Sequence, residues 1–238
     1  PLLGTTLDLG RTKGEVLISP QWVVVDKMMG TIWDGTFTGR ILAQIDDGDA
    51  LNGSFVLQDM NLTSIGKSYD KKMEKATVHG AIEFSSKGGN MNSIQAKGEA
   101  ALVHGDLVEI PLFGFLGEAL SNYIPGLGHL INYKISRADC DFSIEKGYVR
   151  TSNFAAQGSN MSLEGGGWIR LSDLQVNSDF KLGLRGLPGF ITSPVFLLAG
   201  GLFQVRGTGP LSNVSWNFAP FSGGKAPVPP AAAPARKR

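Results

Sequence analysis

Apolar and polar residues alternate one by one along several segments of this chain, and that pattern limits its fold more than any other feature. The clearest segments span residues 37–45, 78–84, 94–102, 138–144 and 180–184. Successive side chains of a β-strand point to opposite sides, so each segment would have one apolar and one polar face. Strands of this kind are typical of an antiparallel sheet with one side in water.

Turn-forming residues lie between these segments. We expect turns at 47–48, 52–53, 87–90, 145–147 and 165–167, all rich in glycine, asparagine or aspartate. The 32 glycines suit many turns and close strand contacts, and they disfavour long helices. The sequence therefore predicts an all-β fold of at least ten mainly antiparallel strands.

Residues 110–124 interrupt the alternation. Pro111 stands where a helix tolerates proline, at its first turn, and Pro125 with Gly126 would end the helix. Most of the surface of this predicted helix is apolar. We expect so wide an apolar surface to pack against the sheet, a protein partner or lipid.

Charge and length exclude several classes of protein. The 22 basic residues include four in the last fourteen positions, which leaves 18 basic against 21 acidic residues in the rest of the chain. A basic groove for nucleic acid is therefore not expected. Residues 110–133 and 186–205 carry little charge, but prolines and glycines interrupt both, so neither is predicted to span a membrane as a helix.

Residues that would indicate catalysis or metal binding are scarce. The three histidines lie 25 residues apart without ligand spacing, and the lone Cys140 falls on an apolar strand face, where we expect a small core residue. Asp139 and Asp141 share the opposite, polar face of that strand, which favours solubilising charge over a catalytic pair. We therefore expect no enzyme activity, no catalytic residue, no metal site and no cofactor.

From Gly98 onward the order of motifs resembles the C-terminal region of AsmA-like proteins, relatives of TamB in the envelope of Gram-negative bacteria. The matching segments are residues 98–102, 105–107, 110–116, 124–128, 138–144, 146–151 and 207–212, followed by Trp216 and Pro220. The chain departs from the family at residues 213–215, where the family often has proline. It also departs in its Pro/Ala/Arg-rich end.

The resemblance implies an elongated, curved sheet with an apolar inner face, accompanied by one or two short helices. It places the body in the periplasm, anchored to the inner membrane by a segment that precedes Pro1. We divide the chain into one elongated β-rich segment, residues 1–221, and a flexible basic tail, residues 222–238, with the best match over 98–221.

Three hypotheses about function follow. The first is binding or transport of phospholipid, or another envelope lipid, between the inner and outer membranes. The second is a structural or interaction module with a closed core that recruits an envelope protein through its sheet edge. The third is an enzyme, which no group of residues supports.

On the first hypothesis, apolar residues of the predicted helix and of two strands contact lipid. They are Leu112, Phe113, Phe115, Leu116, Leu120, Ala138, Cys140, Phe142, Ile144, Phe180, Leu182 and Leu184. An open apolar face would support the lipid hypothesis, because monomers rarely expose several hundred Å² of contiguous apolar surface.

Overall fold

The computed structural model describes residues 11–45, 50–68, 75–88, 91–103, 108–109, 134–159, 161–184, 202–211 and 213–220. These residues form one sheet and little else. The strands are β1 Lys13–Ile18, β2 Trp22–Ile32, β3 Gly35–Gln44, β4 Ala50–Asn61, β5 Thr77–Ser86, β6 Gln95–Val103, β7 Val108–Glu109, β8 Lys134–Glu145, β9 Tyr148–Gly158, β10 Met161–Arg170, β11 Gln175–Leu184, β12 Leu202–Pro210 and β13 Ser215–Pro220. The all-β prediction and the expected minimum of ten strands are confirmed.

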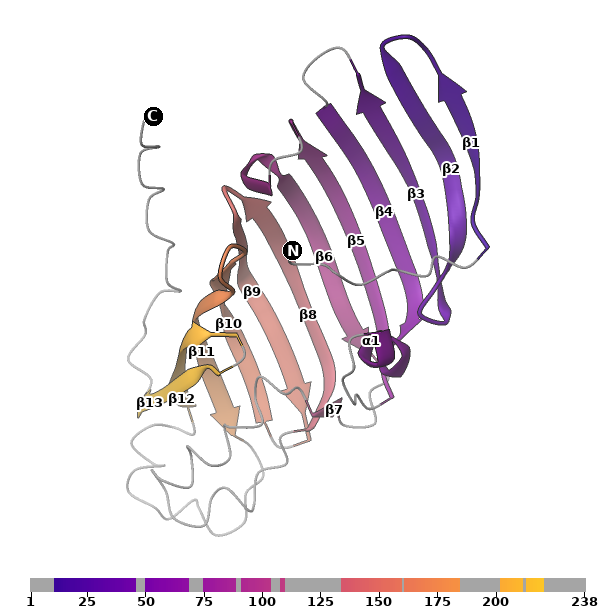
Figure 1. Cartoon of the computed structure of the whole chain (residues 1–238). Coiled ribbons are helices and arrows are strands. Elements are labelled where there is room, and N and C mark those ends of the chain that lie inside the picture. Colours follow the sequence, from indigo (N-terminus) through magenta and orange to yellow (C-terminus); the bar gives the residue numbers. More distant parts are fainter. Residues whose placement is uncertain are drawn as a thin grey trace, which may run out of the picture.

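The strands pair almost entirely in the order of the sequence. Twelve of them follow one another from β1 to β13, and the short β7 pairs with β8 beside this path. Every pairing is antiparallel. The sheet curves without closing, and β12 and β13 lie in front of β10 and β11 in the view of Figure 1. The curved, antiparallel sheet expected from the resemblance is confirmed.

Irregular residues bend individual strands. The register shifts at Lys27 in β2 and at Asp59 in β4, and both residues have positive φ, 48° and 55°. The register of β9 shifts as well, both in its pairing with β8 and in its pairing with β10. An extra residue of this kind bends its strand and increases the local twist. These bulges therefore contribute to the curvature of the sheet.

The turn predictions had mixed outcomes. The turn at residues 145–147 is confirmed: Lys146 and Gly147 join β8 to β9 with φ of 52° and 76°, as in a tight hairpin. The predicted turn at residues 47–48 lies outside the described residues. Of the turn predicted at 87–90, Lys87 and Gly88 follow the end of β5, and residues 89 and 90 lie outside the described residues.

Two other predicted turns were wrong. Asn52 and Gly53 lie inside β4, and the glycines at 165–167 lie inside β10. Gly53 pairs with Ile41 on one side and Phe84 on the other. There the missing side chain makes room for an aromatic ring from the next strand, rather than for a change of direction.

The helix predicted from Pro111 lies outside the described residues. The α-helix that the described residues do contain, α1 (Leu62–Ser68), was not predicted, and a short 3-10 turn, η1 (Met91–Ser93), precedes β6. The side chain of Asn61 accepts a hydrogen bond from the amide of Thr63 at 2.9 Å, which caps the first turn of α1. Figure 1 shows α1 at one end of β4 and β5.

Candidate functional site

Cross-strand pairing aligns apolar residues on one face of the sheet, which we call the inner face. One row of paired residues crosses the sheet from β1 to β12 without a polar side chain. The row consists of Val16, Val25, Ile41, Gly53, Phe84, Ala96, Ile144, Val149, Ile169, Val176 and Gly209. Since paired residues of an antiparallel sheet point to the same side, these residues form one continuous apolar band.

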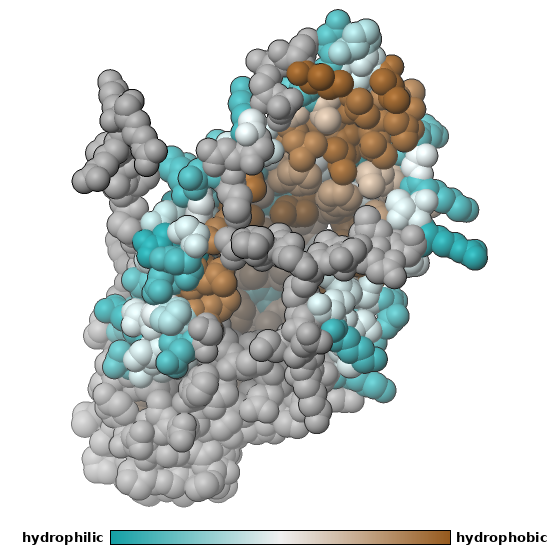
Figure 2. Space-filling view, in the orientation of Figure 1, coloured by the Kyte–Doolittle hydropathy of each residue, from teal (hydrophilic) through white to brown (hydrophobic). Residues whose placement is uncertain are grey.

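A second row runs parallel to the first over β2 to β8. It consists of Gly30, Phe37, Leu57, Gly80, Ala100 and Cys140. Figure 2 shows apolar residues gathered over the first strands and in the hollow of the curved sheet. The apolar inner face expected from the sequence is therefore present.

Burial divides the inner face into two parts. Leu163, Leu182 and Val205, on β10 to β12, are at most 1% exposed, as in a closed core. Phe55, Ile82 and other inner-face residues of β2 to β8 are partly exposed, and on β1 Val16 and Ile18 are 58% and 76% exposed. The inner face is thus open toward β1 and closed toward β12.

The lipid-contacting residues predicted from the sequence fall into three groups. Leu112, Phe113, Phe115, Leu116 and Leu120 lie outside the described residues.

On β8, Cys140, Phe142 and Ile144 lie on the open part of the inner face and are partly exposed, while their neighbour Ala138 is buried. On β11, by contrast, Phe180, Leu182 and Leu184 are buried in the closed part. One row of paired residues runs from β8 to β11 on this face. Ala138 pairs with Ala156 on β9, Ala156 with Leu163 on β10, and Leu163 with Leu182.

Helix α1 closes one margin of the open part. Ile65 packs against a buried cluster of Ile32, Phe37 and Met60, together with partly buried neighbours. Trp33 Nε1 donates a hydrogen bond to Ser68 Oγ at 3.1 Å, which ties the end of α1 to the β2–β3 turn. Sequence reasoning missed this helix because it is short, although the capping Asn61 before Leu62 and Ile65 is a recognisable signal.

The Cys140 thiol reports on the open part of the inner face. Burial raises the pKa of this thiol above its usual value, and the negative charges of Asp141 and Asp139 raise it further. Since a raised pKa leaves less of the reactive thiolate at a given pH, we expect a maleimide to label the native chain much more slowly than the urea-unfolded chain at neutral pH. The difference should narrow as the pH rises toward the thiol pKa. Equal labelling rates in the two states at neutral pH would contradict this.

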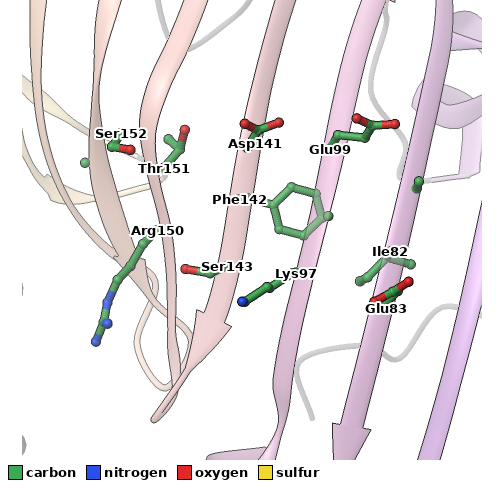
Figure 3. Close-up of a pocket in the computed structure, with 13 residues that line it drawn as sticks. Ile82, Glu83, Lys97, Glu99, Asp141, Phe142, Ser143, Arg150, Thr151 and Ser152 are labelled. Carbon is green, nitrogen blue, oxygen red and sulfur yellow. The ribbon is translucent and has the colours of Figure 1, made fainter.

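The opposite, outer face is polar over the middle strands, while over β1 to β3 it carries apolar residues such as Leu17, Val24 and Leu42. An open groove of about 760 Å³ is lined in part by charged residues from β5 to β9: Glu83, Lys97, Glu99, Asp141 and Arg150. Figure 3 shows Glu99 and Asp141 side by side on neighbouring strands, which agrees with their pairing in the β6–β8 register. The side chain of Asn153 donates a hydrogen bond to the Asp141 carboxylate at 2.7 Å.

The groove therefore presents charges of both signs to water. Arg150, at its margin, lies 3.5 Å from the Glu145 carboxylate and over the ring of Tyr148. Asp139 and Asp141 are both exposed, as expected for solubilising charge. Within the described residues, no group of three or more histidine, cysteine or acidic side chains is placed to hold a metal ion.

Within the described ranges, no helix is both long and apolar enough to cross a membrane. Comparison of the chain with protein-family models, curated proteins and solved structures yields no match. The inner face is therefore the feature from which a function has to be argued.

Proposed function

We propose that this chain binds the hydrocarbon chains of lipids along its inner face, as a non-enzymatic segment of an envelope protein. The observation that carries the proposal is the unbroken apolar row from Val16 to Gly209, whose first half is partly open to solvent. A soluble protein rarely leaves so extended an apolar surface without an occupant. A lipid chain is an occupant that needs no polar partner.

The dimensions of the sheet suit such an occupant. Neighbouring strands lie about 4.8 Å apart, so the path from β1 to β13 covers an arc of about 50 Å. An acyl chain covers about 15 Å, half the thickness of a bilayer hydrocarbon core. The open part, from β1 to β8, is thus long enough for a whole chain.

The energy of binding is adequate as well. Burial of each methylene contributes about 0.8 kcal/mol, so ten of them contribute about 8 kcal/mol before the cost of immobilising the lipid. Because apolar contacts are not directional, a bound chain can shift along the inner face without breaking specific bonds. This property is what transport along a sheet requires.

The finer proposal concerns place and direction. The resemblance to AsmA-like proteins supports a periplasmic location, an anchor in the inner membrane and phospholipid carried toward the outer membrane. On this proposal the polar outer face, with Lys97 and Asp141 among its charged residues, is the side in contact with water. The partners are envelope lipids and membranes.

Lipid analysis of the purified chain tests the proposal. We expect phospholipid to co-purify with the chain and a fluorescent fatty acid to bind with saturation. Ile82→Asp places a charge on the open inner face and should weaken fatty-acid binding by about tenfold, the equivalent of contact with about two methylenes. The circular dichroism of the sheet should persist in this variant, because a partly exposed site keeps a carboxylate in contact with water.

Val56→Asp is the matched control. Val56 lies on the neighbouring strand β4, is 44% exposed and points to the outer face, since it pairs with Ala81 rather than Ile82. Its substitution should leave fatty-acid binding unchanged. A wild-type chain that carries no lipid and binds no fatty acid would reject the proposed function.

A structural module is the second candidate. It is favoured by the closed part of the inner face, where Leu163 and Val205 are fully buried and leave no room for a ligand. On this alternative, the exposed strand β1 offers an edge for strand addition by an envelope protein. Binding of a protein partner by a chain that takes up no lipid would favour it.

A further inference from the structure

Aromatic rings on the inner face lean over glycines of neighbouring strands. A side chain added at any of these glycines would collide with the ring above it. The pairs are Gly30 with Phe37, Gly39 with Phe55, Gly53 with Phe84, Gly98 with Phe142 and Gly207 with Trp216. A Cβ at Gly53, for example, would lie 2.6 Å from Cζ of Phe84.

All five rings lean the same way. Each lies over the strand that precedes its own in the sheet, from β3 onto β2 through to β13 onto β12. Figure 3 shows the Phe142 ring reaching from β8 across to β6. The rings of Phe55 and Phe84 are nearly parallel, with an interplanar angle of 5° and centroids 6.2 Å apart. The Phe37 and Phe55 rings meet at 63°, so the rings differ in tilt. Each nevertheless has ring atoms directly over the glycine of the preceding strand.

From this arrangement we infer that the glycines beneath the rings determine which ligands the inner face accepts, by keeping its surface low enough for one long, unbranched alkyl chain to lie across several strands. This inference rests on the proposed function and deepens it. A methyl group at Gly53 would push the Phe84 ring upward, into the path of such a chain. An upright ring would divide the continuous apolar surface into short compartments.

The span of the open surface agrees with a long ligand. Between β2 and β8 the sheet has five intervals of about 4.8 Å, or about 24 Å, against about 15 Å for an acyl chain. A long chain would thus contact several rings at once. Each added methylene would then add contact until the chain is fully covered.

The first test is a series of saturated fatty acids with the wild-type chain. On a continuous low surface, affinity should rise by about fourfold per methylene from octanoate through laurate to palmitate. An affinity that stops rising after octanoate would overturn the inference, because it would indicate separate compartments. A chain that binds none of the three acids would instead reject the proposed function itself.

The second test compares two glycines of the inner face. Gly53→Ala should weaken palmitate binding by about tenfold while octanoate binding changes little, since a raised ring obstructs long chains first. Gly80→Ala is the control: no ring covers Gly80, and its added Cβ would lie 3.3 Å from the Glu99 carbonyl oxygen and 3.9 Å from Leu57. Its palmitate affinity should remain that of the wild type.

A double variant distinguishes displacement of the ring from misfolding as the cause of weaker binding by Gly53→Ala. Gly53→Ala combined with Phe84→Ala removes the ring that the methyl group displaces, so palmitate affinity should recover at least in part. Thermal unfolding of each variant accompanies the binding measurements. Equal palmitate affinity of wild type and a folded Gly53→Ala variant would overturn the inference, as would a folded double variant that binds palmitate no better than a folded single one.

Discussion

Substitution of Leu182 by aspartate is expected to unfold the protein, whereas the same substitution at Ile144 is expected to leave the sheet folded. Leu182 is 1% exposed and pairs with the buried residues Leu163 and Phe203. An unpaired carboxylate there costs several kcal/mol, a large part of the about 5–15 kcal/mol that stabilises a typical domain. Ile144 is only partly buried, so an aspartate carboxylate at this position would stay in contact with water.

Circular dichroism during thermal unfolding measures both variants. Gln157→Asp serves as the control for added charge, because Gln157 is exposed on the outer face opposite Arg137. We expect its unfolding curve to match that of the wild type. A Leu182→Asp variant with the wild-type melting temperature would show that the inner face is open along its whole length, contrary to the two-part description.

The second large effect is expected at Asp179, a buried carboxylate on the outer side of β11. Asp179 is 7% exposed and accepts hydrogen bonds from Gln204 Nε2, at 2.7 and 2.9 Å, and from Arg206 Nη2 at 2.8 Å. Removal of a buried ion-pair partner is strongly destabilising, but the Arg206 side chain is 56% exposed, which weakens this pair. We therefore expect Asp179→Ala to lower the free energy of unfolding by about 2 kcal/mol, or about 6 °C in melting temperature.

A double-mutant cycle with Arg206→Ala separates the ion pair from the hydrogen bonds to Gln204. The Glu15–Lys27 pair on β1 and β2 provides the comparison, since its side chains are 60% and 66% exposed. Glu15→Ala should leave the melting temperature unchanged. If Asp179→Ala were equally neutral, the network around Asp179 would have no role in stability.

The strands of the fold could be predicted from the sequence because alternation is a local property of each strand. Every segment with strong alternation became a strand. In β8, for example, Cys140 and Phe142 face inward, while the residues between and beside them face outward. The glycines at 53 and 165–167 could not be assigned correctly by the same reasoning. Their role depends on rings from other strands, and a single sequence does not reveal which strands become neighbours.

The candidate site was predicted in part for the same reason. The pattern on β8 and β11 identified which residues point inward, but not that Cys140 is partly exposed while Leu182 is buried. Exposure depends on how strongly the sheet curves, and curvature arises from bulges such as those at Lys27 and Asp59. Helix α1 was missed because seven residues give too short a pattern to separate from the surrounding strands.

The pairing of nearly every strand with its predecessor has a consequence for how such a chain can change in length. In the described part of the chain, each strand pairs with the strands beside it in the sheet, as in repeat proteins, so folding can begin at any hairpin and spread outward. Insertion or loss of two adjacent strands would preserve the up-and-down order and the alternation of faces on either side of the change. Duplication of hairpins in a gene would then lengthen the sheet in steps of about 10 Å, which makes length a property that selection can adjust without inventing a new fold.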